Sequence, residues 1–340
     1  MSKQTLTPEQ IIEAVANSPA RFVKVAVTDI DGILRGKYVH KEKFLSTVQG
    51  GLGFCDVIFG WDMNDVCYDN VEFTGWHTGY PDAEARLDLG TFRQIPWEDG
   101  VPFFLGDFAE NAGNAPTPPC PRRMLKSVIA QATEMDFETA CSMEFEWFNF
   151  DESAESLAEK GFIRPQPFTS GMHGYSLLRT SQNSDFFASL NNSLLDFGVP
   201  LEGLHTETGP GVLEAAILYS GALEAADRAV LFKWATKSIA HEFGIMPSFM
   251  AKWNAELPGC SGHIHQSLWT ADGKTNLFFD ESGEDSMSDT FRHYLAGQML
   301  CLPEILPLLA PNINSYKRLV EGHWAPTRVT WGMGKWINAF

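Results

Sequence analysis

The sequence predicts an α+β protein, because strand signals and helix signals dominate different parts of the chain. Near the N-terminus, residues 22–29 alternate between apolar and polar side chains, and Asp31-Gly32 then marks a two-residue hairpin turn. Farther along, residues 185–197 and 222–243 have the length of helices, and a glycine follows each of them. Between these regions, residues 111–121 concentrate proline, glycine and asparagine, as segments between domains do.

The N-terminal domain is expected to span residues 1–112 and to be mostly β. Thr7 and Gln10 form a capping-box pattern, so a helix should run from there to about Asn17. Val23, Val25 and Val27 share one face of the first strand, which should therefore face the core. The other expected elements are a strand over 33–39, a short helix over 41–48, and strands over 54–59, 85–89 and 103–108.

The second domain is expected to span residues 113–340. It should open with an amphipathic helix over 122–135, whose apolar face comprises Leu125, Val128, Ile129 and Ala132. A strand through residues 141–148 should follow, and helices over 185–197 and 222–243 should then alternate with short strands.

Composition limits the classes of partner and the cellular location. The formal net charge of −18 argues against nucleic acid or an anionic membrane surface as a partner. The six cysteines are scattered without a Cys-x-x-Cys pair, which is typical of free thiols in a reducing cytoplasm. The N-terminus has no apolar signal core, and no apolar run approaches the length needed to span a membrane. We therefore expect a soluble, cytoplasmic protein.

Two glutamates interrupt the apolar run over residues 141–148. Glu144 and Glu146 have the same parity along the strand, so both side chains should point to the same face. Like charges placed side by side repel each other. Either water screens them on a solvated outer face or a cation binds between them, and this run alone leaves both interpretations open.

A second pair of carboxylates lies in residues 204–214, where Gly-Pro-Gly joins two strand-like runs. If the turn is centred on Pro210 and Gly211, Glu207 and Glu214 lie directly opposite each other. The alternative is that one of these glutamates simply faces water across the hairpin.

A third cluster lies in residues 258–268, where a glycine-rich segment enters a strand that carries His263 and His265 at the same parity. Histidine binds metal ions and also hydrogen-bonds phosphate groups, although both side chains could instead be exposed without a ligand. Carboxylates with one imidazole suit Mg²⁺ or Mn²⁺ better than structural Zn²⁺. The sequence contains neither a Walker-type phosphate loop nor a Rossmann fingerprint.

A fourth motif lies in residues 314–320, where Lys317 and Arg318 follow a polar turn. Arg318 could hold a carboxylate through two parallel hydrogen bonds. It could equally be an exposed charge on the surface of an acidic protein.

Taken together and in this order, the motifs resemble those of the glutamine synthetase family. They are Met143-Glu-Phe-Glu146, His205-Thr-Glu207 through Glu214, Gly259-x-Ser-Gly-His-Ile-His265-Gln-Ser267 and Asn314-Ser-Tyr-Lys-Arg-Leu-Val320, with Lys252 at the family's spacing before His263. The resemblance implies a β-grasp-like N-terminal domain. It also implies a catalytic domain built on an antiparallel sheet with flanking helices.

The function implied by the resemblance is ATP-dependent ligation of ammonia or an organic amine to the γ-carboxylate of glutamate, through γ-glutamyl phosphate. By position in the motifs, Glu146, Glu207 and Glu214 would hold one divalent ion, Mg²⁺ or Mn²⁺. Glu144 and His263 would hold a second ion.

The resemblance also implies roles in substrate binding and assembly. His265 and Ser267 would lie near ATP, Gly259 would contact glutamate, and Arg318 would bind the glutamate carboxylate. Members of the family form rings with active sites between neighbouring subunits, which implies a homo-oligomeric ring, either a hexamer or a stacked double ring. Asp62 is the candidate for an acid that the first domain presents to the neighbouring subunit.

The chain departs from the family pattern at two places. Trp324 occupies the position of the family's flap glutamate, which favours an organic amine over ammonium, although Glu321 nearby could still accept a proton. After Gly332 the family pattern ends, which implies an incomplete catalytic domain. A non-catalytic family member that keeps the fold and the assembly surfaces is therefore the alternative to a ligase.

Overall fold

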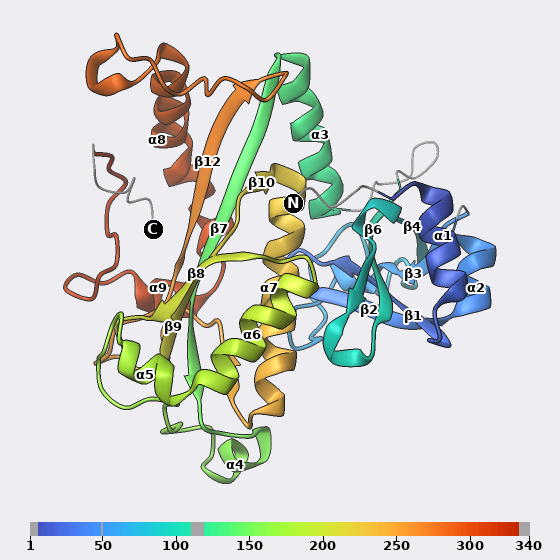
Figure 1. The fold of residues 1–340 in the computed structure, drawn as a ribbon, viewed down its shortest axis with the longest axis horizontal. Coiled ribbons are helices and arrows are strands. Elements are labelled where there is room, and N and C mark those ends of the chain that lie inside the picture. The colour runs from blue at the N-terminus through green and yellow to red at the C-terminus, as the bar shows by residue number, and fades with distance from the viewer. Residues whose placement is uncertain (1–5, 49, 110–118, 333–340) are drawn as a thin grey trace. The chain divides into compact units, whose positions relative to one another are not determined.

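The structure is a computed structural model that describes residues 6–48, 50–109 and 119–332. The chain divides into two compact units (Figure 1). The first unit ends at Ala130 and also includes Asp196–Gly198, and the second unit contains the other residues from Gln131 onward. Helices and sheets in both units confirm the predicted α+β class. Most of the proline-rich segment predicted to separate the domains lies outside the described residues, so the boundary at residues 112 and 113 stays a prediction.

The first unit contains short helices and a sheet. Its helices are α1 (Pro8–Asn17), α2 (Lys41–Thr47) and the start of α3 (Pro121–Glu134). Its strands are β1 (Phe22–Thr28), β2 (Leu34–His40), β3 (Leu52–Cys55), β4 (Asp82–Leu87), β5 (Arg93–Ile95) and β6 (Val101–Phe108). The capping box at Thr7 forms as predicted, with Gln10 and Thr7 bonding each other's backbone N–H groups.

The sheet of the first unit has the order β2-β1-β6-β4-β3, with β5 also paired to β6. β1 and β6 run parallel, whereas the other described pairs are antiparallel. Val23, Val25 and Val27 are 0%, 1% and 0% exposed, which confirms the inward face that alternation predicts. In the same core, the Phe104 ring stacks on Phe44 and Phe92 with centroids 4.8 and 5.4 Å away.

The strand predicted over residues 54–59 is only partly correct. β3 ends at Cys55, and a 3₁₀ helix, η1 (Asp56–Phe59), follows it. The buried Asp56 carboxylate accepts a hydrogen bond from the Thr74 hydroxyl at 2.5 Å, and the Asp56 N–H donates to Pro81 O at 3.0 Å. These bonds turn the backbone, because a buried carboxylate must find a donor.

The second unit is built on a second sheet with helices around it. Its helices are the end of α3, α4 (Ala154–Glu159), α5 (Leu177–Gln182), α6 (Ser184–Asp196, of which Asp196 groups with the first unit), α7 (Ala222–Glu242), α8 (Asp289–Leu309) and α9 (Ile313–Arg318). Its strands are β7 (Phe137–Phe150), β8 (Leu201–Thr206), β9 (Val212–Ile217), β10 (Ser220–Gly221), β11 (Met246–Ser248) and β12 (Gly262–Thr270). None of the described helices is both long enough and apolar enough to cross a bilayer.

β7 is the central strand of the second sheet. The sheet has the order β10-β7-β9-β8, and β11 and β12 also pair with β7, all in antiparallel register. β12 runs beside β7 along the long ribbon seen in Figure 1, from Gly262 opposite Phe145 to Thr270 opposite Phe137. As a result, residues that are far apart in the sequence meet along β7.

One face of β7 is covered by α7. The rings of Phe145 and Trp147 lie 5.6 and 5.4 Å from the ring of Phe232 on α7. Because side chains alternate along a strand, Glu144 and Glu146 are directed to the opposite face. The parity read from the sequence is therefore confirmed.

Two further local predictions, one in each unit, are wrong. Val128, which was assigned to the apolar face of α3, is 55% exposed. The polar turn predicted before Arg318 is the helix α9, which begins where the Asn312 side chain accepts the N–H of Ser315 at 3.0 Å. Asparagine is a good N-cap residue, and this is the sequence signal that was overlooked.

We predict that Phe104→Ala lowers the free energy of unfolding of the first unit by about 3–5 kcal/mol, because the fully buried ring leaves a cavity. Urea denaturation followed by circular dichroism measures the change. Phe22→Ala is the matched control, since its ring is 45% exposed, and it should cost less than about 1 kcal/mol. Equal effects of the two substitutions would contradict the assigned core.

Candidate functional site

The candidate site is a cluster of acidic and imidazole side chains on the face of β7 that α7 leaves open. Glu146 of β7 pairs with Glu214 of β9, and Glu214 pairs in turn with His205 of β8. Two residues away along β7, Glu144 pairs with His263 of β12. Cross-strand partners share a face of the sheet, so four strands contribute side chains to one surface.

The register of the β8–β9 hairpin differs from the prediction. Glu214 lies opposite His205, and the Glu207 N–H instead bonds Val212 O at 3.0 Å, so Glu207 and Glu214 are not directly opposite each other. The turn lies one residue earlier than expected. Gly211 is held there by Asn149, whose backbone N–H and side-chain amide both donate to Gly211 O, at 2.8 and 3.1 Å.

The two hairpin glutamates still converge, and a histidine joins them. Ligand atoms of His205, Glu207 and Glu214 all lie within 4.8 Å of one another. Nδ1 of His205 is 3.8 Å from Glu207 Oε2, and Nε2 is 3.9 Å from Glu214 Oε1. His205 is not among the ligands predicted from the sequence, although its shared parity with Glu207 is a usable signal.

Glu146 is held in place by the segment that enters β12. Its carboxylate accepts the Ser261 N–H at 2.7 Å, and its own N–H donates to Ser261 O at 3.0 Å. Burial raises the pKa of Glu146, and the bond from Ser261 opposes that rise. This carboxylate is therefore rigidly placed and costly to ionise without a nearby cation.

Glu144 contacts both histidines of β12. Its Oε2 accepts a hydrogen bond from Nε2 of His265 at 2.9 Å, and its Oε1 lies 3.6 Å from Nδ1 of His263. The bond from His265 lowers the pKa of Glu144 to about 2. Burial, together with a hydrogen bond to Glu144, raises the pKa of Glu214 to about 9. The Glu144 and Glu214 carboxyl groups thus share a proton, as crowded carboxylates do.

The chemistry of the donors fits a divalent cation. Carboxylate oxygens with imidazole nitrogens are ligands of Mg²⁺ and Mn²⁺, and the crowding that forces a proton onto Glu214 would be relieved equally by a metal ion. The solvated-face interpretation of Glu144 is disfavoured, because its side chain is only 12% exposed.

Arg318 lies buried at the end of α9, beside Gly259. The residue is 6% exposed, and its Nη1 and Nη2 donate to the carbonyl oxygens of His323 and Trp324 at 3.0 and 3.1 Å. Among the described residues, its Nε has no hydrogen-bond partner. A Cβ at Gly259 would overlap the Arg318 side chain and the carbonyl of Ala251, so only glycine fits there without rearrangement. The exposed-charge interpretation of Arg318 is wrong.

The other predicted site residues lie in varied environments. Ser267 accepts a hydrogen bond from the Trp269 ring N–H at 2.9 Å. Glu321 is exposed, and Trp324 is 84% exposed with a φ of 58°. Asp62 belongs to the first unit, where its carboxylate accepts the N–H groups of Asn64 and Val66 at 2.8 and 3.0 Å.

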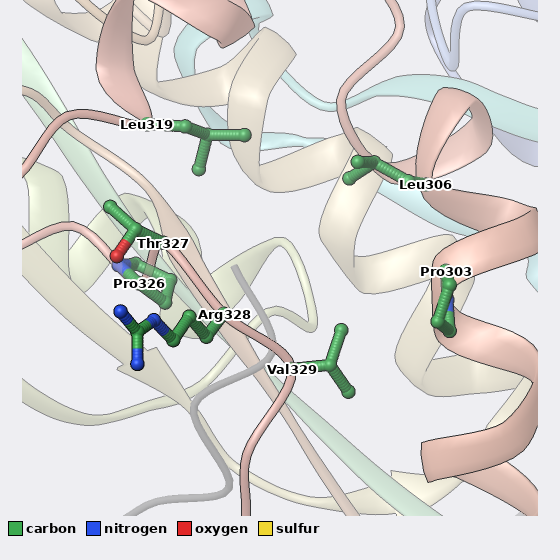
Figure 2. Close-up of a pocket in the computed structure, with 7 residues that line it drawn as sticks. All are labelled: Pro303, Leu306, Leu319, Pro326, Thr327, Arg328 and Val329. Carbon is green, nitrogen blue, oxygen red and sulfur yellow. The ribbon is translucent and has the colours of Figure 1, made fainter.

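A separate cavity of about 290 Å³ lies between α8 and the segment that follows α9 (Figure 2). The residues that line it are Pro303, Leu306, Leu319, Pro326, Thr327, Arg328 and Val329. None of the predicted site residues lines this cavity, so the acidic cluster is a different feature of the unit.

Comparisons with known proteins agree with the motifs. A family model described as the catalytic domain of glutamine synthetase matches residues 118–335. Type-1 glutamine synthetase 2 of Dictyostelium discoideum is 59% identical over 98% of this chain and 63% of its own length. A glutamate–isopropylamine ligase of a Pseudomonas species is 35% identical over 91% of this chain and 67% of its own length. The chain therefore spans about two-thirds of the length of these relatives.

Solved structures also share the fold. A solved structure of a GmaS complex with ADP superposes with a TM-score of 0.77 at 26% identity. The match covers 93% of this chain and 68% of the GmaS chain. The likeness extends over most of the chain.

We predict that Gly259→Ala destabilises the second unit by about 1–3 kcal/mol, because the new methyl group overpacks against Arg318 and the Ala251 carbonyl. Gly297→Ala in α8 is the matched control, since nothing lies within 4 Å of a Cβ built there. It should be neutral or stabilising by up to about 1 kcal/mol. Thermal denaturation compares the two, and similar melting temperatures would refute the close approach.

Proposed function

This chain belongs to the glutamine synthetase family, and from that premise we propose that it catalyses ATP-dependent ligation of an amine to the γ-carboxylate of glutamate, through γ-glutamyl phosphate. The observation that carries the proposal is the convergence of Glu144, Glu146, Glu207 and Glu214 with histidines on one face of the sheet. The non-catalytic alternative is not favoured, because the named relatives are synthetases and ligases.

The acidic cluster would hold two divalent ions, Mg²⁺ or Mn²⁺. We assign Glu146, Glu207 and Glu214 to one ion and Glu144 with His263 to the other, and the geometry of His205 adds it as a candidate ligand beside Glu207 and Glu214. When bound, these ions would offset the negative charge of the phosphates and the carboxylate, so that one anion can approach another.

The remaining residues would bind the substrates. His265 and Ser267, on the same strand as His263, are proposed to contact ATP. The Nε–H of Arg318, which has no hydrogen-bond partner among the described residues, is proposed to bind the glutamate carboxylate. Gly259, where only glycine fits beside Arg318, is proposed to contact glutamate. In a homo-oligomeric ring, a hexamer or a stacked double ring, Asp62 would serve the site of a neighbouring subunit. We place the protein in the cytoplasm, where its described cysteines, all free, would stay reduced.

The acceptor is proposed to be a small organic amine, with ammonia as the second candidate. The exposed ring of Trp324 offers an apolar surface to an alkyl group, and one relative is named for its use of isopropylamine. Glu321, in the same loop, has an exposed carboxylate that could accept a proton from either acceptor.

We predict that Glu146→Ala reduces ADP release at least about 100-fold, because water cannot replace this half-buried ligand without loss of ion affinity. ADP release with glutamate and amine is measured beside calorimetric titration with Mn²⁺. Glu138→Ala, which changes an exposed residue of the same strand, is the control and should behave as the unaltered chain does. Unchanged Mn²⁺ affinity and ADP release in Glu146→Ala would sink the metal assignment.

We further predict that Trp324→Ala raises the KM for isopropylamine at least about tenfold, because the alkyl group loses its apolar contact, while the KM for ammonium changes little. ADP release, measured with ammonium, methylamine, isopropylamine and ethanolamine as acceptors, gives the KM for isopropylamine and the KM for ammonium. Release with ammonium alone would overturn the preference for an organic amine. No release with any acceptor, together with no Mn²⁺ binding, would overturn the ligase proposal itself.

A further inference from the structure

The loop Glu321–Trp324 follows Arg318 and precedes residues that line the apolar cavity. Arg318 bonds the carbonyl oxygens of His323 and Trp324, while Leu319 and Pro326, on either side of the loop, line the cavity shown in Figure 2. Open space therefore lies next to residues that flank the loop. Its position must depend on a small number of polar contacts.

One of these contacts is made by the His323 side chain. Its Nδ1 lies 2.9 Å from Nζ of Lys252 and 3.2 Å from the carbonyl oxygen of Leu257. A lysine ammonium can only donate, so Nδ1 accepts from Lys252 and the ring proton is on Nε2. Nδ1 and the Leu257 carbonyl are then both acceptors, so the bond to Lys252 is the one that holds the ring.

Lys252 is a rigid anchor for that bond. It is 5% exposed, and burial together with the nearby Arg318 charge lowers its pKa. The Asn314 side chain bonds both the N–H and the carbonyl of Lys252, at 2.8 and 2.6 Å. Asn314 and Arg318 both belong to α9, so this helix supports the anchor and also bonds the loop directly.

The loop needs such an anchor because it carries strain and little packing. Trp324 has a φ of 58°, which is unfavourable for a non-glycine residue by about 1–3 kcal/mol. Its ring is 84% exposed, so burial does not compensate for that cost. Hydrogen bonds from Lys252 and Arg318 to the neighbouring His323 can compensate.

We infer that His323 is a positioning residue, whose Nδ1 bond to Lys252 fixes the Glu321–Trp324 loop beside Arg318 and so sets the place of Trp324 in acceptor binding. The part that concerns acceptor binding rests on the proposed function. The part that concerns the loop does not, because it follows from contacts within the chain.

The loop can be tested in the full chain without substrates, by hydrogen–deuterium exchange of peptides that cover residues 319–328. Asparagine places its amide oxygen where Nδ1 of histidine lies, whereas glutamine places it near the Nε2 position. We expect His323→Ala and His323→Gln to raise exchange in this segment by about tenfold, the worth of one hydrogen bond to a charged group. His323→Asn should retain the protection of the unaltered chain.

Lys252→Met should raise exchange as His323→Ala does, since it removes the donor of the same bond. Lys317→Met, at an exposed position of α9, is its control and should change nothing. If a His323 variant fails to fold, the comparison of Lys252→Met with Lys317→Met decides the question. Unchanged exchange in both His323→Ala and Lys252→Met, or equally raised exchange in His323→Asn and His323→Ala, would overturn the inference.

Kinetics then separate positioning from general damage. His323→Ala and His323→Gln should raise the KM for isopropylamine at least about tenfold and leave the KM for ATP unchanged, with His323→Asn close to the unaltered chain. A rise in the KM for ATP as well as in the KM for isopropylamine would contradict a positioning role. So would a His323→Asn variant that behaves like His323→Ala. If the unaltered chain releases no ADP with any amine, the proposed function fails, and the exchange result still decides whether His323 holds the loop.

Discussion

The mutual repulsion of carboxylates on one face of β7 is the constraint on which the rest of the second unit depends. Four carboxylates approach one another here: Glu144 and Glu146 of β7, Glu214 of β9, and Glu207 directly after β8. Their side chains are largely withdrawn from water. Such a group cannot ionise fully without compensation. The protein compensates with His265 beside Glu144, the Ser261 N–H on Glu146 and a proton on Glu214. A cation of higher charge than a proton would offset the negative charge of the carboxylates more completely.

The framework that resists this repulsion is the apolar packing behind the sheet. Phe145 and Trp147 alternate with the two glutamates, and Phe232 of the long helix α7 stacks on Phe145 and meets Trp147 edge to face. β7 is also hydrogen-bonded on both sides, by β9 and by β12. Strand pairing and aromatic burial therefore hold the carboxylates in positions that their charges alone would not favour.

Positive charge is supplied from the C-terminal part of the described chain. Lys252 and Arg318 are both nearly fully buried, and the pKa of each is lowered chiefly by burial. Arg318 is also attracted by the Glu146 carboxylate, whereas Lys252 is bonded to His323. The loop that follows Arg318 is thus tied to two buried cations, of which Arg318 also interacts with Glu146 of the acidic cluster. Changes in the charge of the cluster and in the position of the loop are therefore expected to influence each other.

The features that depend on local periodicity can be predicted from the amino-acid sequence. Alternation placed Val23, Val25 and Val27 inward and Glu144 with Glu146 on one face, and the capping pattern located the start of α1. The order of the motifs was sufficient to suggest the family. These features follow from residues close together in the chain, whose geometry is set by the backbone.

Which residues meet across strands depends instead on contacts between distant parts of the chain. Asn149 of β7 holds Gly211 and so sets the β8–β9 turn, which places Glu214 opposite His205. That contact joins residues distant in the sequence, so no local pattern reveals it. The same holds for the bond between Lys252 and His323, because a buried ammonium takes whichever acceptor the fold brings to it.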